Sequence, residues 1–552
     1  MADIEPVTAE IIKHSLIYAA EEMGVALKKS AYSPNIRERA DHSCALLDGR
    51  GRTVAQAEHI PVHLGSLPWG LRNTLAHLDR EGIALEEGDM ILLNNPYIAG
   101  THLNDVTVIR PVFLDGKPEA YAANKAHHAD VGGAVPGSIG AASEEIFQEG
   151  IILPPVKILR RDEFQVDLVR ALTSNVRMPE VTMGDLRAQI AANLLGERRI
   201  REVVDRYGAA AVRASWDRIL DQTERTVRME YGKMPRGRYE AEDHLESASP
   251  RRQGRIRIHT AINVNEDGIR VDFAGTDSQV EGPVNSVFGV AIAATLFAVR
   301  SLLRADIPLN DGFHRTVEIS APEGTIVNPQ WPAAVAAGNV ETPQRIVDVI
   351  YRAFAPALPD RVPAASHGSM TNVMLGGIHP TTRRPWAFYE TIGGGYGGRK
   401  GLDGVDGVHV NMTNTLNTPI EVIERYYPLR FVAYRLRPDS GGTGRWRGGC
   451  GIERAWIATA PMRFTIVGER SEIPPWGLFG GGPGGPSRYA VVRADGTEER
   501  LGSKAEVSLR PGDRVVVLTG GGGGYGESKD RDPKQASADA DAGLVSPKVP
   551  GA

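Results

Sequence analysis

Histidine and aspartate side chains are concentrated in the N-terminal quarter of the chain. Seven of the 14 histidines lie between residues 42 and 128, several of them beside aspartates. They occur in four short segments: R-A-D-H-S (39–43), A-E-H-I-P-V-H (57–63), G-T-H-L-N-D (100–105) and A-H-H-A-D (126–130). Imidazole and carboxylate groups together form the ligand set of a zinc, manganese or iron(II) centre. The pattern predicts a divalent metal site whose ligands come from several segments, because one strand aims only alternate side chains at a point.

The spacing of these residues limits which of them could share an ion. His102 and Asp105 are three apart and would face opposite sides of a strand, so they can share a metal only if the T-H-L-N-D segment turns. His127 and His128 are adjacent on a predicted strand, so only one of them should point inward. We assign His127 as the ligand, and His128 with Asp130 as groups for proton transfer, although the residues alone do not separate the two histidines.

A fourth ligand and a second histidine pair lie upstream. Asp41 is the predicted fourth ligand, because its charged segment R-E-R-A-D-H directly precedes an apolar strand. His59 and His63 are four apart, as in a helical zinc pair, but Pro61 lies between them and disfavours a helix. We expect this segment to be an extended loop that lines the pocket.

Other catalytic or nucleotide-binding motifs are absent, or lack the secondary structure that the motif requires. T-I-G-G-G-Y-G-G-R-K (391–400) contains G-x-G-x-x-G, but no helix is predicted to follow it, so it does not predict a dinucleotide site. A glycine loop that lets the backbone approach a ligand or partner is favoured instead. The sequence contains no G-x-x-x-x-G-K-[ST] and no G-x-S-x-G. Its two cysteines, Cys44 and Cys450, exclude a disulfide framework and a cysteine-rich zinc site.

Composition excludes several classes of partner. The 552 residues include 63 Lys and Arg against 68 Asp and Glu, a formal charge of -5, which argues against nucleic-acid binding through a positive field. We find no apolar run long enough for a membrane span. The N-terminus lacks the basic and apolar regions of a signal peptide. We therefore expect a cytoplasmic protein with neither nucleic acid nor membrane as a partner.

The helices and strands expected around these residues indicate an α+β fold with several domains. Apolar spacing predicts a helix over 7–29 and a long helical region over 182–229, broken at Tyr207-Gly208. Strands are predicted at 44–48, 53–57, 90–94, 106–113 and 121–130. We divide the chain into an N-terminal mixed α/β domain with the metal site (1–237), a central strand–helix domain (238–425), a C-terminal all-β module (426–526) and a disordered tail (527–552).

Several long segments give the chain a resemblance to a known family. They are S-P-N-I-R-E-R-A-D-H-S-C-A-L (33–46), A-Q-A-E-H-I-P-V-H-L-G-S (55–66), N-P-Y-I-A-G-T-H-L-N-D (95–105), A-H-H-A-D-V-G-G (126–133), I-F-Q-E-G (146–150), G-N-V-E-T-P-Q-R (338–345), Y-E-T-I-G-G-G-Y-G (389–397) and N-T-P-I-E (417–421). Through these segments the sequence resembles the B-type subunits of the hydantoinase/oxoprolinase family, and the resemblance extends from about residue 7 to 525. That family includes N-methylhydantoinase B, the second half of 5-oxoprolinase, and subunits of acetone and acetophenone carboxylases.

The resemblance implies a division of labour between two subunits. An A-type hydantoinase subunit would bind ATP and Mg and phosphorylate the substrate, and this B-type chain would hydrolyse the activated cyclic amide within a hetero-oligomer. The substrate would be a hydantoin, 5-oxoproline or another lactam. The resemblance also implies a metal held by Asp41, His102, Asp105 and His127, all present here.

Three alternatives remain from the sequence. The chain could be a subunit of an ATP-dependent ketone carboxylase, because the same scaffold serves that reaction, and nothing in the residues separates it from a hydrolase. It could be a non-catalytic scaffold for the A-type subunit, although the intact His/Asp set argues against this. A mononuclear iron oxygenase is disfavoured, because the H-x-x-D spacing differs from the usual H-x-D.

Overall fold

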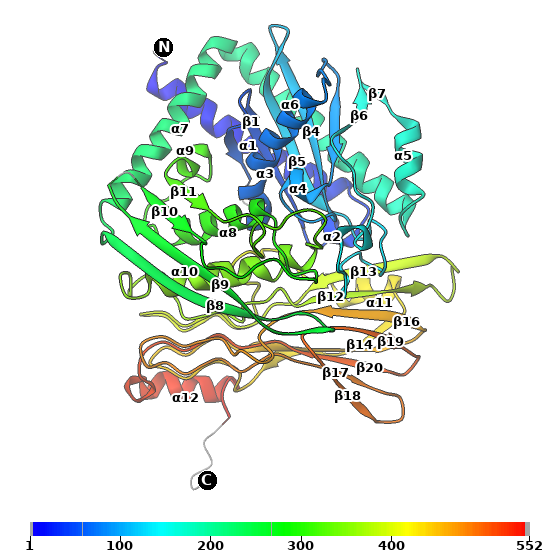
Figure 1. The fold of residues 1–552 in the computed structure, drawn as a ribbon, viewed down its shortest axis with the longest axis vertical. Helices are drawn as coiled ribbons and strands as arrows, with labels where there is room; N and C mark the ends of the chain where they lie inside the picture. The colour runs from blue at the N-terminus through cyan, green and yellow to red at the C-terminus, as the bar shows by residue number, and fades with distance from the viewer. Residues whose placement is uncertain (1–3, 58, 267, 547–552) are drawn as a thin grey trace.

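The N-terminal region is built on a seven-stranded sheet (Figure 1). The computed structural model describes residues 4–57, 59–266 and 268–546. The strand order is β2-β1-β5-β4-β3-β6-β7, and every neighbouring pair is antiparallel. The strands are β1 (His42–Asp48), β2 (Thr53–Gln56), β3 (Met90–Leu93), β4 (Asp105–Leu114), β5 (Lys117–His127), β6 (Val156–Arg160) and β7 (Glu163–Phe164).

Helices cover both faces of this sheet. They are α1 (Pro6–Ser30), α2 (Pro34–Arg37), α3 (Pro61–Arg80), α4 (Pro96–Ala99), α5 (Val166–Thr173), α6 (Pro179–Tyr207) and α7 (Ala209–Tyr231). Cys44 and Leu46 of β1 pack in a core shared with α1 and α6, whereas Ala45 and Leu47 pack in the core beneath α3. Alternate side chains of a strand point to opposite faces, so burial on both sides requires the continuous apolar run of β1.

The central region adds a four-stranded sheet and two helices that join it to the first sheet. The sheet has the order β11-β10-β9-β8. Its elements are β8 (Gly237–Ser249), β9 (Arg252–Val264), β10 (Ile269–Asp272), α8 (Phe288–Ser301), α9 (Asp311–His314), β11 (Val317–Ser320) and α10 (Thr342–Phe354). Helix α8 packs on α3, where Gly65 approaches Ala293 so closely that a Cβ at Gly65 would lie 2.5 Å from the Ala293 Cα. The two regions therefore share a packed interface.

Two further sheets stack in the C-terminal part. Their orders are β13-β12-β16-β19 and β14-β15-β20-β17-β18. The elements are β12 (Asn372–Ile378), β13 (Pro385–Thr391), α11 (Ile420–Tyr426), β14 (Leu429–Arg437), β15 (Gly451–Ala458), β16 (Met462–Val467), β17 (Arg488–Val492), β18 (Glu498–Leu501), β19 (Lys504–Leu509) and β20 (Arg514–Leu518). Leu375 and Phe464 from one sheet share a core with Trp456 and Val517 from the other.

The predicted boundaries of the C-terminal module differ from this arrangement. Strands β12 and β13 precede residue 426 but pair with β16, so the sandwich crosses the predicted boundary. The predicted disordered tail contains a helix, α12 (Pro533–Asp541). Polar contacts hold this helix: Asp532 caps its start, and Asp539 lies 3.1 Å from Arg447 Nε. The low apolar content of this segment gave no sign in the sequence that it packs against the protein. Residues 547–552 of the predicted tail lie outside the described residues.

The remaining elements agree with the predictions at several places. The fold is α+β, as predicted. The helix predicted over 7–29 is α1, and the break predicted at Tyr207-Gly208 separates α6 from α7. Gly208 has a φ of 81°, a left-handed conformation that glycine adopts without strain. Among the described helices, none combines the length and apolar character needed to cross a membrane.

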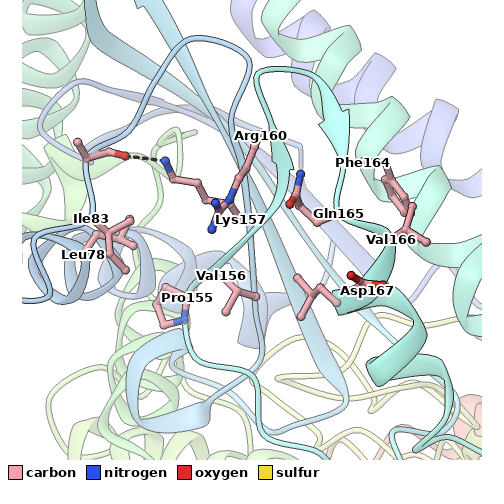
Figure 2. Close-up of a pocket in the computed structure, with 12 residues that line it drawn as sticks. Leu78, Ile83, Pro155, Val156, Lys157, Arg160, Phe164, Gln165, Val166 and Asp167 are labelled. Atoms are coloured by element: carbon pink, nitrogen blue, oxygen red, sulfur yellow. Dashed lines mark hydrogen bonds between the residues drawn. The ribbon is translucent and has the colours of Figure 1, made fainter.

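A cavity of about 680 Å³ lies between the end of α3, β6 and α5 (Figure 2). Leu78, Ile83 and Val156 contribute apolar walls, and Lys157 Nζ donates a hydrogen bond to the Ala84 carbonyl oxygen (2.7 Å). None of the predicted site residues lines this cavity. It is therefore separate from the candidate metal site.

The buried His367 makes the fold sensitive to acid. Burial, with lesser contributions from His409 and Arg470, lowers its pKa to about 3. In the unfolded chain this pKa returns to about 6.5, so the stabilising effect of neutral His367 is complete above that pH and is lost as the pH falls toward 3. At pH 5 the loss amounts to about 2 kcal/mol.

We therefore predict that His367→Gln reduces the pH dependence of stability. Urea denaturation at pH 7.5 and pH 5 should show that the variant loses about 2 kcal/mol less unfolding free energy than the native chain. Equal losses of unfolding free energy in the two proteins would show that His367 does not cause the pH dependence.

Candidate metal centre

Two neighbouring strand ends bring the candidate ligands together. Asp105 begins β4 and His127 ends β5, and the antiparallel register places these two residues opposite each other. His102 precedes β4 in a turn, in which the Asp105 N–H donates to the His102 carbonyl oxygen (3.0 Å). The turn enters through Gly100, whose φ is 84° and where a Cβ would lie 2.8 Å from the Trp69 ring. The T-H-L-N-D segment therefore turns, as the shared-metal prediction required.

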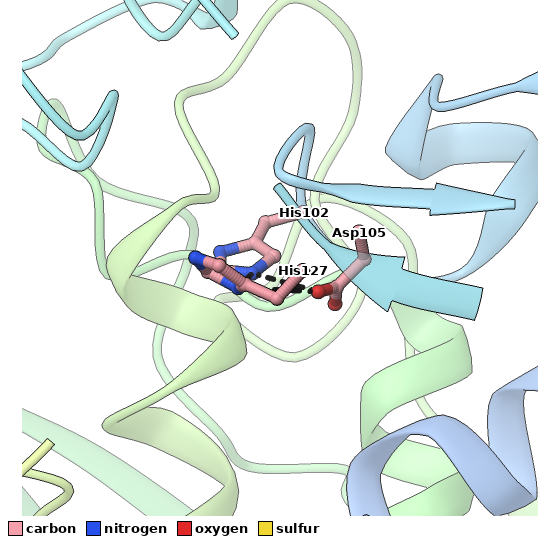
Figure 3. A group of neighbouring side chains, drawn as sticks. All are labelled: His102, Asp105 and His127. Atoms are coloured by element: carbon pink, nitrogen blue, oxygen red, sulfur yellow. Dashed lines mark hydrogen bonds and ion pairs between the residues drawn. The ribbon is translucent and has the colours of Figure 1, made fainter. Parts of the chain in front are cut away.

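The three side chains meet at nearly equal distances (Figure 3). Asp105 Oδ1 lies 3.2 Å from His102 Nε2 and 3.3 Å from His127 Nδ1, and the two nitrogens are 3.2 Å apart. The exposed fractions of His102, Asp105 and His127 are 1%, 0% and 2%. Donor atoms at about 2.0–2.1 Å from a tetrahedral metal ion would be about 3.3–3.4 Å from one another. The spacing therefore fits a divalent ion, and Asp105 Oδ1 has no hydrogen-bond partner among the described residues.

The hydrogen bond of His102 fixes which nitrogen faces the cluster. His102 Nδ1 lies 3.2 Å from the Ala336 carbonyl oxygen. A carbonyl oxygen can only accept, so Nδ1 carries the proton and Nε2 presents its lone pair to the other two groups. This is the arrangement that commonly orients a metal-ligating histidine.

His127 and Asp105 are each oriented by residues far away in the sequence. The His127 ring stacks on Tyr389, with centroids 4.4 Å apart and an interplanar angle of 14°. The Tyr389 hydroxyl donates to Asn372 Oδ1 (2.8 Å), which fixes the phenol ring. Asn339 Nδ2 donates to Asp105 Oδ2 (3.3 Å) and leaves Oδ1 for the cluster.

The protonation states favour ligation by Asp105 and His127. Burial raises the pKa of Asp105, but the nearby His102 and His63 overcome this effect and hold it well below its usual value. Burial lowers the pKa of His127, which keeps its imidazole neutral. Burial also acts to lower the pKa of His102, but the Asp105 carboxylate raises it above the ordinary value. Protons and a cation therefore compete for His102 Nε2.

The fourth predicted ligand, Asp41, lies close to this group but is not part of it. The His127 N–H donates to the Asp41 carbonyl oxygen (3.0 Å), and the Asp41 carboxylate faces Arg39 at 3.8 Å. Its negative charge acts on both His102 and His127. The preceding Ala40 has a φ of 55°, a left-handed conformation that is uncommon for alanine. Ligation by Asp41 remains a prediction.

The predicted proton-transfer residues have other partners. His128 Nε2 lies 2.8 Å from Gln189 Oε1 of α6. Asp130 accepts hydrogen bonds from the backbone of Gly132 and Gly137 and pairs with Arg177 Nη1 at 2.8 Å. Strand β5 ends at His127, so strand alternation no longer relates His128 to Asp130. The structure does not bring these two side chains to the cluster.

His63 is a member of the site that the sequence interpretation missed. The segment around Pro61 was predicted to be extended, but this was wrong: α3 begins at Pro61. Proline is tolerated in the first turn of a helix, where its missing N–H has no intrahelical partner. This turn places His63 Nε2 3.3 Å from Asp105 Oδ1, while His63 Nδ1 lies 3.2 Å from Ser43 Oγ. Proline at a helix start was the signal that could have revealed it.

Comparisons with known proteins identify the family of the chain. The family model described as Hydantoinase B/oxoprolinase matches residues 5–528 of the chain. The chain therefore belongs to the hydantoinase B/oxoprolinase family.

Individual relatives cover the chain almost completely. "Uncharacterized protein MJ0963" of Methanocaldococcus jannaschii is 48% identical, over 94% of this chain and 90% of its own length. "5-oxoprolinase 1" of Arabidopsis thaliana is 35% identical over 94% of this chain, which spans only 42% of that relative. The crystal structure of an ATP-dependent caprolactamase from Pseudomonas jessenii superimposes with a TM-score of 0.90 at 28% identity, covering 98% of this chain and 95% of that one.

We predict that metal affinity weakens as the pH falls from about 8 to about 5. Protons compete for His102 Nε2, whose pKa is raised by Asp105, so the cation must displace a proton at lower pH. Titration with Mn²⁺ or Zn²⁺ against a chelator of known pH dependence measures this effect. An affinity independent of pH over this range would show that His102 is not a ligand.

Proposed function

We propose that this chain is the B-type subunit of an ATP-dependent cyclic amide hydrolase, and that it hydrolyses a hydantoin, 5-oxoproline or lactam after a partner A-type subunit has phosphorylated it. The observation that carries the proposal is the buried group of His102, Asp105 and His127, whose donor atoms are 3.2–3.3 Å apart. Membership of the hydantoinase B/oxoprolinase family supports the reaction class.

The division between two subunits is supported by the relatives and by the sequence. The chain spans 42% of 5-oxoprolinase 1, which leaves more than half of that relative to supply another part of the activity. The sequence lacks G-x-x-x-x-G-K-[ST], in agreement with binding of ATP and Mg by a partner. A hetero-oligomer with an A-type hydantoinase subunit follows from the proposal.

The residues present would hold a divalent ion, either Zn, Mn or Fe. His102 Nε2, Asp105 Oδ1 and His127 Nδ1 are the ligand atoms, with Asp41 as the proposed fourth ligand. Such a cation, when bound, supplies Lewis-acid activation of water near neutral pH. Water adds to the ring carbon that carries the phosphorylated oxygen, and the C–N bond then breaks as the ring nitrogen takes a proton. The acyl phosphate formed in this way loses phosphate to a second water, which leaves a carboxylate and a free amine.

The chain's own residues orient the ligands and handle the proton. The Ala336 carbonyl fixes the His102 tautomer, Asn339 turns Asp105, and Tyr389 holds the His127 ring. Burial of the ligands excludes bulk water and strengthens the electrostatic interactions among them. We retain His128 and Asp130 as proposed proton-transfer groups, a role that requires them to exchange their present partners Gln189 and Arg177.

We predict that His102→Ala abolishes bound metal and ATP-dependent ring opening together. The substitution removes the ligand atom Nε2 and the hydrogen bond from His102 Nδ1 to the Ala336 carbonyl oxygen. His14→Ala is the matched control, because the His14 side chain is exposed. Elemental analysis and turnover by the chain with its natural partner measure the two effects. Full turnover by a metal-free His102→Ala protein would refute the proposed mechanism.

An assay of ATP consumption with different substrates separates the hydrolase from the carboxylase and the scaffold. The purified pair should consume ATP with hydantoins, 5-oxoproline or lactams. ATP use that needs a ketone and bicarbonate would instead identify a carboxylase. A chain that binds no metal, and that leaves the activity of its partner unchanged after His102→Ala, would behave as a scaffold.

A further inference from the structure

The I-F-Q-E-G segment (146–150) contains a fully buried carboxylate that the proposed mechanism does not use. Glu149 has an exposed fraction of 0%. Its Oε1 accepts hydrogen bonds from the N–H groups of Val335 (3.1 Å) and Ala336 (2.9 Å), and its Oε2 accepts from Val335 (3.1 Å). A buried carboxylate needs partners, and backbone N–H groups supply them here. No ion pair to Glu149 occurs among the described residues.

These partners belong to the stretch that orients two of the three ligands. Ala336 donates its N–H to Glu149 and accepts the His102 Nδ1 proton at its carbonyl oxygen. Three residues later, Asn339 donates to Asp105 Oδ2. A 3-10 helix, Ala337–Asn339, connects these two contacts, and the Asn339 N–H closes it on the Val335 carbonyl oxygen (3.2 Å). Residues 335–339 therefore form one small rigid unit, here called the 335–339 segment.

The 335–339 segment also has contacts with the core and with a neighbouring loop: Val335, Ala336 and Ala337 are buried in the main core. The Gly338 N–H donates to the Pro283 carbonyl oxygen (2.7 Å). A Cβ at Gly338 would lie 1.7 Å from the Asn285 carbonyl oxygen, so the segment is pressed against a neighbouring loop. Glu149 holds the opposite, N-terminal end of the segment, because its two carboxyl oxygens accept hydrogen bonds from the N–H groups of Val335 and Ala336.

We propose that Glu149 is a positioning residue for the metal centre: it anchors the 335–339 segment so that Ala336 fixes the tautomer of His102 and Asn339 orients Asp105. This inference rests on the proposed function, because it assumes that His102 and Asp105 bind a cation. Among the described residues, no hydrogen bond or ion pair joins Glu149 to the side chains of His102, Asp105 or His127, so Glu149 acts on them through the segment. Loss of such outer contacts typically weakens metal affinity 10–100-fold.

The test is the affinity of the full chain for Zn²⁺, measured by competition with a chromophoric chelator. Glu149→Gln keeps the size of the side chain but replaces one accepting oxygen with an amide NH₂, which cannot accept from the backbone N–H donors, so affinity should fall about 10–100-fold. Asp89→Asn is the matched control. Asp89 is also fully buried and accepts backbone hydrogen bonds, from Glu86 (2.9 Å) and Arg161 (3.2 Å), but it pairs with Lys157 at the cavity of Figure 2. This control should bind Zn²⁺ like the native chain.

The outcomes separate the positioning role from the function itself. If the native chain binds no Zn²⁺, Mn²⁺ or Fe²⁺, the proposed function fails. If the native chain binds the metal and Glu149→Gln binds it equally well, only the positioning role is overturned. An equal loss of affinity in Asp89→Asn would also overturn it, because the effect would then reflect general destabilisation.

A second variant covers the case in which Glu149→Gln does not fold. Glu149→Asp keeps both carboxyl oxygens but withdraws them by one methylene group, so it should fold and lose affinity severalfold. Native affinity in this variant, together with the failure of Glu149→Gln to fold, would assign Glu149 a purely structural role and overturn the proposal.

Discussion

The site depends on the buried negative charge of Asp105. Its carboxylate has no exposed surface, and three imidazole nitrogens, from His63, His102 and His127, lie 3.2–3.3 Å from one oxygen. Isolated burial of a carboxylate would be strongly unfavourable, so this charge requires cationic or hydrogen-bonding partners. A divalent ion shared with two of the imidazoles satisfies that requirement and uses the lone pair that the His102 tautomer leaves free.

Two distant parts of the chain hold the candidate ligands. The 335–339 segment orients His102 and Asp105, and Tyr389 of β13 holds the ring of His127. These contacts link the N-terminal sheet to the central region and to the C-terminal sandwich. The ligand geometry therefore requires all three regions to pack together.

The sequence predicted those parts of the site that depend on local spacing. Clustering of histidine and aspartate indicated the segments that hold His102, Asp105 and His127, and a turn in T-H-L-N-D was required and found. The residues alone did not separate His127 from His128. The contacts of Glu149, Asn339 and Tyr389 were not predictable, because residue spacing carries no information about pairs separated by hundreds of positions. The same limit applies to the sandwich, in which strands from either side of residue 426 pair, and to α12, which polar contacts hold in place of apolar burial.

X-ray diffraction at the absorption edge of the metal would test the central claim most directly. Crystals of the chain grown with Mn²⁺ or Zn²⁺ should give one strong anomalous peak within about 2.3 Å of His102 Nε2, Asp105 Oδ1 and His127 Nδ1. A peak at other residues only, or none at a saturating metal concentration, would contradict the account.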